Sequence, residues 1–234
     1  MTKGLYQAVS SMAAAEKRLD VIAQNIANAS ATGYKRQVGT VNSFEQIVNG
    51  RMVSGQTLTT STDHQQGELI ETGNPLDLAF MGKGFFAFEG NEGDDIFTRD
   101  GSLRMTAEGD LVSPAGRPVV WDNRQNQLEP TGQRIEIDGA GYVFQGNVEI
   151  GQLRLVDFED PSKLVIDDEG FYHAPASMDQ DPATGVVYAG TYEASNVQAV
   201  SEMVEMILAQ RNYQSASNTV SQIAESYSKL TQLN

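Results

Sequence analysis

Cysteine is absent from the 234 residues of this chain. Its absence excludes disulfide bonds and thiolate metal sites, and it leaves the redox compartment unassigned. The chain has only two histidines, His64 and His173, which lie 109 positions apart and outside any recognisable metal-binding spacing. We therefore expect no metal ligand at either position.

Long hydrophobic runs are also absent. The longest apolar run near the N-terminus covers only residues 12–15. A secretory signal needs a longer apolar core, and a helix that crosses a bilayer needs roughly 20 apolar residues. We therefore expect no membrane insertion, and export, if it occurs, without a cleaved signal peptide.

Positive charge is scarce, with 16 Lys and Arg against 31 Asp and Glu, a net charge of −15. Phosphate groups would be repelled by such a surface, so no nucleic-acid partner is expected. The charge is uneven, because residues 1–36 carry +3, residues 193–234 carry −2 and the remainder carries −16. The opposite signs of the two terminal segments modestly favour their approach, since exposed charge pairs are weak and screened.

Glycine and proline are missing from residues 5–32 and 191–234. In the first of these segments, apolar residues repeat every seven positions along two seams. Together they predict a helix over about residues 4–28, which the Asn, Ser and Gly residues of 28–33 should end. One seam contains Leu5, Met12, Leu19 and Ile26, and the other contains Ala8, Ala15, Ile22 and Ala29.

The C-terminal segment predicts a second helix, with Ser195 or Asn196 as its N-cap. Its apolar residues form two stripes that are rotated around the helix relative to one another, so the helix should meet more than one neighbour. The first stripe contains Val197, Val200, Val204 and Ile207, and the second contains Met206, Tyr213, Val220, Ile223, Tyr227 and Leu230.

The segment between the helices has a different composition. Residues 36–75 are polar and predict an extended arm or loose hairpin connector, whereas residues 76–190 alternate short apolar runs with glycines. Gly93, Gly101, Gly109 and Gly116 recur at the spacing of a β-meander. We predict an α+β fold in which a mainly antiparallel β domain (76–190) is inserted into a discontinuous, coiled-coil-like region of paired terminal helices (1–35 and 191–234).

No motif in the chain indicates catalysis. Gly82, Lys83 and Gly84 lack the glycine spacing and the following Ser or Thr of a phosphate-binding loop, and they favour a tight turn into a core strand. Three clusters of carboxylates fail to match the EF-hand pattern and are more typical of solvated turns. The sequence therefore predicts no catalytic, cofactor-binding or metal-binding residue, and the protein is not expected to be an enzyme.

Three segments resemble bacterial flagellar rod and hook proteins. Residues 19–29 (LDVIAQNIANA) with 32–35 (TGYK) resemble the N-terminal signature of that family. Residues 73–78 (GNPLDL), 82–86 (GKGFF) and 97–101 (FTRDG) resemble the start of its central β domain, and residues 195–213 resemble its C-terminal helix. The order and spacing of these segments cover almost the whole chain.

Within the family, the resemblance points to a rod protein, because hook proteins carry further domains. The short connector after the first helix favours the proximal-rod type, and the distal-rod type comes second. A soluble module that binds a ligand through its β domain, or an enzyme that uses His173, would need a pocket that the sequence does not identify.

The resemblance implies a subunit whose terminal helices pack in the inner layer of a helical tube that transmits torque. It also implies partners among other rod subunits, including further copies of this chain, and contact with the flagellar type III export apparatus. Its implied location is the periplasmic rod of the flagellar basal body. No cofactor is implied.

The stripes and the resembling motifs together predict the subunit interface. An intramolecular helix pair is the alternative, but the N-terminal seam runs over about four heptads, longer than the roughly 10–14 residues of an average helix. Since isolated helices with a narrow apolar stripe are marginal in water, the termini should gain order on assembly. The predicted interface residues are Leu5, Val9, Met12, Leu19, Ile22, Asn25, Ile26, Asn28, Val197, Val204, Ile207, Arg211, Tyr213, Val220, Ile223 and Tyr227.

Overall fold

The computed structural model describes residues 2–48, 51–91, 93–167 and 169–232. The chain divides into two compact units. The terminal unit comprises Met1–Ala29, Arg36–Asp63 and Val197–Asn234, and the β unit comprises Ser30–Lys35 and His64–Asn196. The chain therefore enters and leaves the β unit twice. The sequence-based boundaries at residues 35, 75 and 190 remain predictions.

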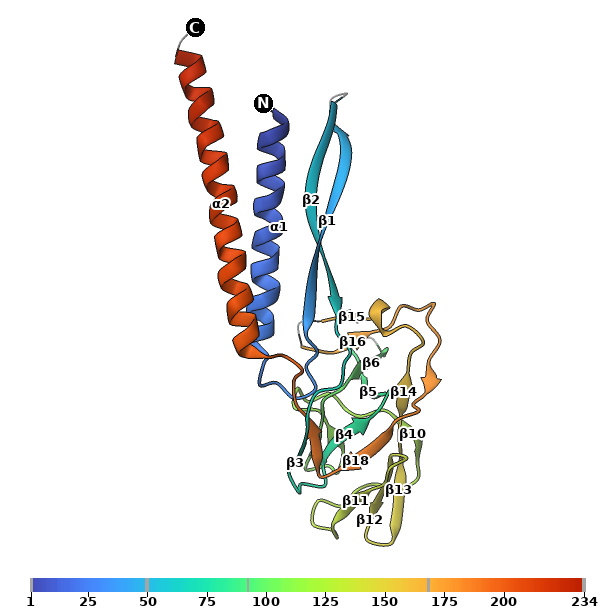
Figure 1. Ribbon diagram of the computed structural model, residues 1–234. Helices are drawn as coiled ribbons and strands as arrows, with labels where there is room; N and C mark the ends of the chain where they lie inside the picture. Colours follow the sequence, from blue (N-terminus) through green and yellow to red (C-terminus); the bar gives the residue numbers. More distant parts are fainter. Residues whose placement is uncertain (1, 49–50, 92, 168, 233–234) are drawn as a thin grey trace. The chain divides into compact units, whose positions relative to one another are not determined.

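The terminal unit consists of two helices and a hairpin (Figure 1). Helix α1 (Thr2–Ala27) contacts both helix α2 (Ala199–Gln232) and strand β2 (Arg51–Thr62). Strand β1 (Gln37–Val48) pairs with β2 in an antiparallel register without a bulge. The polar connector thus forms a long hairpin.

Burial along α1 follows its two neighbours. Ala8, Ala14 and Ile22 are buried, although only Ala8 and Ile22 belong to the predicted seams. Ala15, a predicted seam residue, is half-buried. A helix that contacts both a second helix and a hairpin buries residues on more than one side, so the predicted heptad seams do not describe its burial fully.

Helix α2 begins later than the sequence predicted. Ala199 is its first residue, and the Glu202 N–H donates to the Gln198 carbonyl at 3.0 Å. Neither Ser195 nor Asn196 is therefore the N-cap. The Asn196 side chain instead donates to the Gln65 carbonyl at 3.0 Å within the β unit, a long-range bond that local capping preference does not reveal.

The described residues of the β unit form five small sheets, and their paired strands are antiparallel, as the sequence predicted. Their strand orders are β10-β13-β12-β11, β15-β16-β6-β5-β14-β17, β18-β4-β7, β19-β3 and β8-β9. A short 3-10 helix, Pro161–Lys163, precedes β15. The strands are β3 (Leu69–Glu71), β4 (Asp77–Met81), β5 (Phe85–Glu89), β6 (Asp95–Thr98), β7 (Gly101–Ser102), β8 (Arg104–Met105), β9 (Leu111–Val112), β10 (Trp121–Arg124), β11 (Ile135–Ile137), β12 (Tyr142–Gln145), β13 (Val148–Leu153), β14 (Leu155–Asp157), β15 (Val165–Ile166), β16 (Tyr172–His173), β17 (Asp181–Pro182), β18 (Val186–Ala189) and β19 (Thr191–Glu193).

Strand β5 supplies both hydrophobic cores of the β unit. Phe86 and Phe88 pack in the larger core, while Phe85 and Ala87 pack in the smaller one. Successive side chains of a strand point to opposite faces, so a strand buried on both sides must be continuously apolar. The turn at residues 82–84 thus leads into a core strand, as predicted.

Truncation of Phe97 should destabilise the β unit. Phe97 is fully buried, and its ring lies edge-on to Phe158 with centroids 5.0 Å apart. We expect Phe97→Ala to lower the free energy of unfolding by about 3–5 kcal/mol, because it leaves a cavity in the smaller core. Urea unfolding followed by the fluorescence of Trp121, the single tryptophan, measures the change. Val165→Ala, at a side chain that is 64% exposed, is the control, and equal losses in both variants would contradict the prediction.

Candidate assembly interface

Helix α2 displays an apolar surface that its own subunit covers only in part. Its five residues follow the i, i+3, i+4, i+7 spacing of one helix face. Val200 is 76% exposed, and the other four are 47–54% exposed. We call this set the α2 apolar surface; its members are Val200, Met203, Val204, Ile207 and Leu208.

The buried side of α2 has the opposite character. Glu202 is only 1% exposed and Ala209 is 2% exposed. A carboxylate therefore lies inside the unit, while a row of aliphatic side chains lies outside. A helix with exposed apolar residues and a buried carboxylate is typical of one that gains a further neighbour on assembly.

The predicted interface residues are distributed unevenly between exposed and buried positions. Val9, Val204, Ile207 and Arg211 are exposed. Ile22, Asn25 and Val197 are buried within the terminal unit. The half-buried members are Met12, Leu19, Ile26, Asn28, Tyr213, Val220 and Ile223, and the side chains of Leu5 and Tyr227 lie outside the described residues.

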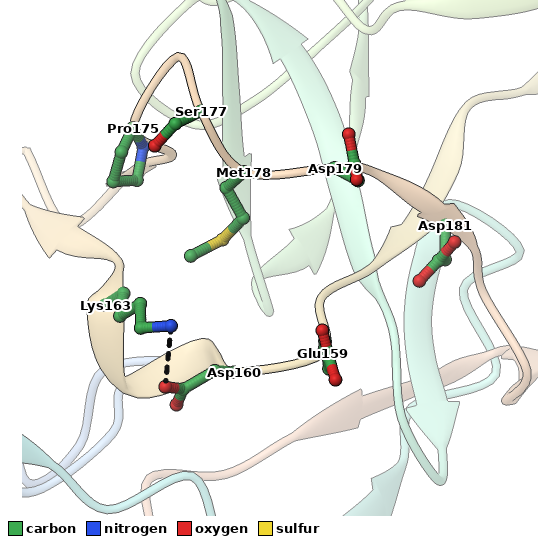
Figure 2. Close-up of a pocket in the computed structure, with 8 residues that line it drawn as sticks. All are labelled: Glu159, Asp160, Lys163, Pro175, Ser177, Met178, Asp179 and Asp181. Carbon is green, nitrogen blue, oxygen red and sulfur yellow. Dashed lines mark ion pairs between the residues drawn. The ribbon is translucent and has the colours of Figure 1, made fainter.

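One pocket of the β unit is lined mainly by polar and charged side chains. This pocket of about 260 Å³ has Lys163 paired with Asp160 at 3.3 Å on one side, and carboxylates that include Asp179 and Asp181 at its other end (Figure 2). Across the described ranges, no group of three or more His, Asp or Glu side chains is arranged to hold a metal ion. This lining identifies no ligand.

Both histidines have partners in the β unit. The Nε2 atom of His173 lies 2.9 Å from a carboxylate oxygen of Asp167. His64 packs against the rings of Phe85 and Tyr172, and its Nε2 lies 3.1 Å from the Pro161 carbonyl.

A polar cluster, the terminal junction, joins α1, β1 and α2 within the terminal unit. The Asn25 amide bonds the backbone of Gln37 twice, donating from Nδ2 to the carbonyl and accepting at Oδ1 from the N–H, both at 2.8 Å. It also donates to Glu202 at 3.2 Å, and Arg36 Nε donates to the other Glu202 oxygen at 2.6 Å. These bonds satisfy the buried Glu202 carboxylate, which explains why α2 buries a charge.

An ion pair links the two helices directly, outside the terminal junction. Arg18 donates to Glu205 at 2.6 Å, and each side chain is 38% exposed. Solvent screens such a pair, so its contribution is about 0–1 kcal/mol. It aligns the helices more than it stabilises them.

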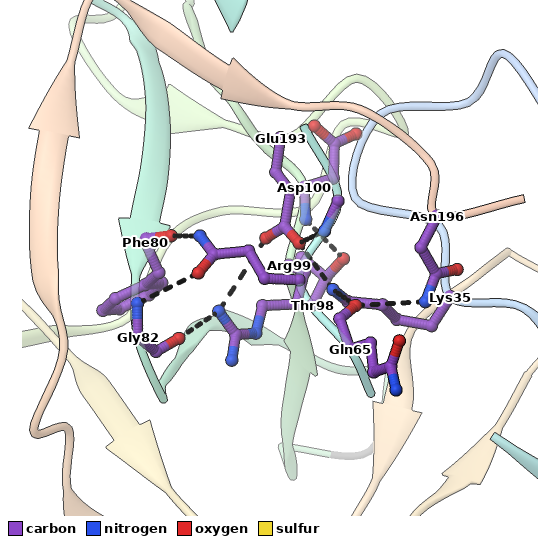
Figure 3. A network of polar contacts seen from close by, with 11 residues as sticks. Lys35, Gln65, Phe80, Gly82, Thr98, Arg99, Asp100, Glu193 and Asn196 are labelled. Carbon is purple, nitrogen blue, oxygen red and sulfur yellow. Dashed lines mark hydrogen bonds and ion pairs between the residues drawn. The ribbon is translucent and has the colours of Figure 1, made fainter. Parts of the chain in front are cut away.

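A buried ionic cluster, the β-unit junction, closes the β unit where the chain enters and leaves it (Figure 3). Lys35 Nζ donates to Glu193 Oε1 at 2.5 Å and to the Gln65 carbonyl at 2.8 Å. Glu193 also accepts the Gly67 N–H at 2.8 Å, and Arg99 lies 3.8 Å from its second oxygen. Lys35 is 1% exposed and Glu193 is 0% exposed. Charges this deep are costly to remove from water, and these partners offset that cost.

Gly33 lies where the chain passes close to the backbone at Arg99 and Asp100. Its N–H donates to the Glu193 carbonyl at 2.7 Å, and its φ of +67° lies in the left-handed region. A Cβ there would lie 2.4 Å from the Asp100 nitrogen. Both the conformation and the space therefore demand glycine.

Burial shifts the ionisation of residues beside this junction. Desolvation lowers the pKa of Arg99, and the carboxylates of Glu193 and Asp157 oppose that shift. The guanidinium also lies 5.1 Å from the centroid of the Phe85 ring, which supports a cation in an apolar setting. Burial raises the pKa of Asp100 and of Tyr172.

The described part of the chain contains no helix that is both long and apolar enough to cross a membrane.

Family models match three parts of the chain in order. "Flagella basal body rod protein" matches residues 5–35, "Flagellar hook protein FlgE/F/G D1 domain" matches residues 79–171, and "Flagellar basal body rod FlgEFG protein C-terminal" matches residues 188–233. The matched segments include α2, all but the first three residues of α1, and most of the β unit.

Whole proteins of the same kind align with nearly the full chain. The basal-body rod protein FlgF of Caulobacter vibrioides is 32% identical over 234 aligned positions, covering 96% of this chain and 95% of its own length. FlgG of Agrobacterium fabrum is 34% identical over 250 positions, with 93% and 94% covered. FlgF of Mesorhizobium japonicum is 32% identical over 237 positions, with 97% and 95% covered.

The chain belongs to the flagellar basal-body rod protein family.

The β-unit junction unites the three segments that match the rod family models. Lys35 is the last residue of the N-terminal match, Arg99 lies in the D1 match, and Glu193 lies in the C-terminal match. Sequence reasoning included Tyr34 and Lys35 in the N-terminal motif but assigned them no contact. Because Lys35 and Glu193 are separated by 158 positions, no local pattern could have paired them.

Removal of the Glu193 charge should destabilise this rod protein. Glu193→Gln leaves Lys35 buried without its counter-ion, and loss of one partner of a buried pair costs about 3–5 kcal/mol. Urea unfolding followed by Trp121 fluorescence measures the loss. Glu136→Gln on the exposed side of β11 makes the same chemical change as a control. A loss below about 1 kcal/mol for Glu193→Gln would show that the pair is dispensable.

Asp100 should give the rod protein a specific dependence on pH. Since its folded pKa is raised above the ordinary 3.8, the folded state holds this proton more tightly than the unfolded state. Ionised Asp100 therefore destabilises the folded state. This destabilisation is complete at pH values above the folded-state pKa, and it is lost as the pH falls through the unfolded-state pKa. The unfolding free energy of Asp100→Asn minus that of the native chain should therefore be larger at pH 7 than at pH 4. An unchanged or reversed difference in paired urea titrations would contradict this assignment.

Proposed function

We propose that this rod protein is a proximal-rod, FlgF-like structural subunit that assembles through the exposed apolar residues of its terminal helices. The single observation that carries this proposal is the α2 apolar surface. Its side chains follow one helix face, and none is more than about half-covered by the subunit itself.

Burial of the α2 apolar surface would make a substantial favourable contribution to the free energy of assembly. Full burial of a Val, Leu, Ile or Met side chain stabilises by about 1.5–3 kcal/mol, and each of these five side chains still has about half or more of that stabilisation to gain. Val9 on α1 is 49% exposed and adds to the apolar area. The buried members of the predicted interface, Ile22, Asn25 and Val197, support the helices from inside instead.

The geometry of a rod follows from repeating one such contact. A face on one subunit that docks to a different face of the next is heterologous, and repetition without closure builds a helical filament. Arg211, Tyr213, Val220 and Ile223 continue along α2 beyond the apolar surface. We propose that they meet other neighbours in the same assembly.

The proximal type is favoured over the distal type by the number of unmatched positions. The alignment with Caulobacter FlgF uses 96% of the 234 residues, about 225, across 234 positions. The alignment with Agrobacterium FlgG uses 93%, about 218, across 250 positions. The alignment with Caulobacter FlgF therefore has about 9 positions at which this chain has no residue, and the alignment with Agrobacterium FlgG has about 32. FlgG-like distal-rod function is the alternative.

Location and partners follow from the rod family. We propose that the chain lies in the periplasmic rod of the basal body, contacts other rod subunits and copies of itself, and is exported by the flagellar type III apparatus without cleavage of a signal peptide. The net charge of −15 supports the absence of a nucleic-acid partner. We also propose a purely structural role, without catalysis, cofactor or membrane insertion.

The test uses a strain that lacks this gene and carries a plasmid copy. A proximal subunit predicts that the deletion strain makes basal bodies without a distal rod. Ile207→Asp should fail to restore rods and swimming, because it places a charge on a surface that becomes buried. Electron microscopy of basal bodies and motility assays report both results.

The matched control is Gln210→Asp, which adds the same charge at an exposed polar position of α2. It should restore motility. Circular dichroism of both purified variants should be unchanged, since both residues are exposed. Full motility of Ile207→Asp would exclude the α2 apolar surface from the interface, and a complete distal rod in the deletion strain would exclude the proximal assignment.

A further inference from the structure

The two outer edges of the β1–β2 hairpin differ. On the β2 side, α1 contacts the strand, and the Gln56 N–H donates to the Ser10 hydroxyl at 3.2 Å. On the β1 side, no further strand of the described chain pairs with the hairpin. Strand β1 is therefore an open sheet edge.

Hydrogen bonds reveal which β1 residues direct their backbone outward. The Gln56 N–H donates to the Ser10 side chain, whereas the residue opposite Gln56 on β1 is Ser43. Gln56 and Ser43 are therefore a non-hydrogen-bonded pair of the hairpin, and their backbone groups point away from each other. The Gln37 backbone also points outward, because the Asn25 amide bonds it. With a period of two, Gly39, Val41, Ser43, Glu45 and Ile47 have the same orientation.

Asn25 occupies only the first position along this edge. Its amide supplies one donor and one acceptor to Gln37, as a neighbouring strand would. The structure shows no such bond to the outward backbone groups of Gly39, Val41 or Ser43 from the described residues outside the hairpin. These groups form a continuous row that a strand could fill.

Strand β1 has little that discourages strand pairing, since Glu45 is its one charged side chain. Natural edge strands are protected by Lys, Pro or bulges. Residues 37–48 contain no Lys or Pro, and their register with β2 has no bulge. Val41 is 40% exposed and Ile47 is 71% exposed on the same face. The edge therefore favours addition of another strand.

Charge favours a second copy of this chain as the occupant of that edge. The hairpin 37–62 contains one Glu and one Arg and has no net charge, whereas the whole protein carries −15. Two copies repel one another through most of their surfaces, and least through their hairpins.

The β1 sequence is self-complementary around Phe44. Antiparallel pairing centred there places Val41 of one copy opposite Ile47 of the other, and Ser43 opposite Glu45. The two Phe44 side chains then become cross-strand neighbours, and such aromatic pairs are stabilising. This register buries both exposed aliphatic residues and avoids opposing the two carboxylates directly.

We propose that free subunits associate as a two-fold dimer through β1, in a four-stranded sheet with order β2-β1-β1-β2. A two-fold contact uses the same edge on both copies and closes after two subunits. The dimer is therefore distinct from rod assembly through α2. It covers an edge that would otherwise template uncontrolled strand addition.

Sedimentation velocity of the full-length protein over a concentration series tests the dimer. The native chain should show a monomer–dimer equilibrium, and Val41→Lys should raise the dissociation constant at least about tenfold, because lysine opposes edge pairing. Thr57→Lys, on an exposed face of β2, should change it little, and so should Ile207→Asp. A monomer at all concentrations up to about 500 µM, or dimer loss in Ile207→Asp with no effect of Val41→Lys, would overturn the proposal.

Cysteine cross-linking tests the register in a chain that has no cysteine of its own. Phe44→Cys should form a disulfide-linked dimer under mild oxidation, because the two residues face each other at a close, non-hydrogen-bonded position. Thr40→Cys should not, since the register separates the two Thr40 residues by eight positions along the strand. Equal cross-linking of both variants, or cross-linking of Thr40→Cys alone, would overturn the proposed pairing.

Discussion

The buried contact between Lys35 and Glu193 is the constraint on which the β unit depends. Both charges are removed from water, which costs several kcal/mol for each ion unless partners replace the lost solvent. Those partners come from residues 65, 67 and 99 as well as from the pair itself. The pair is therefore stable only when several distant segments are in place together.

This requirement also determines where the chain passes from one unit to the other. Lys35 is followed directly by Arg36, which bonds Glu202 in the terminal unit. Glu193 is followed within a few residues by Val197, where the chain re-enters that unit. A buried carboxylate in each unit thus binds the connecting segment next to it, Glu193 in the β unit and Glu202 in the terminal unit. Glycine at position 33 is needed because the first segment lies directly against the backbone of Asp100.

The terminal unit buries a polar cluster together with small and aliphatic side chains, and it leaves one row of apolar side chains on α2 half exposed or more exposed. Glu202 is buried by Asn25 and Arg36, while Ile207 and its neighbours remain exposed. The buried Glu202 carboxylate has hydrogen-bond partners within the subunit, and the exposed apolar side chains of α2 can still be buried by further subunits. The open β1 edge is a different kind of surface, because its unmet capacity is backbone hydrogen bonding rather than apolar area. The α2 apolar surface suits an open helical array of subunits, and the β1 edge suits a closed dimer.

The sequence by itself determined the α+β class, the two terminal helices, the antiparallel β insert and, through its motifs, the rod family. Helix and strand periods are local, so Leu19 and Ile22 or Phe85 and Phe86 indicate their element without knowledge of distant partners. Only the tertiary structure decided which side of each helix is buried, that α2 begins at Ala199, and that Lys35 meets Glu193. These outcomes depend on contacts between residues more than a hundred positions apart, and on the competition of two neighbours for α1. A local pattern carries no information about such contacts, because desolvation and pairing are properties of the assembled fold.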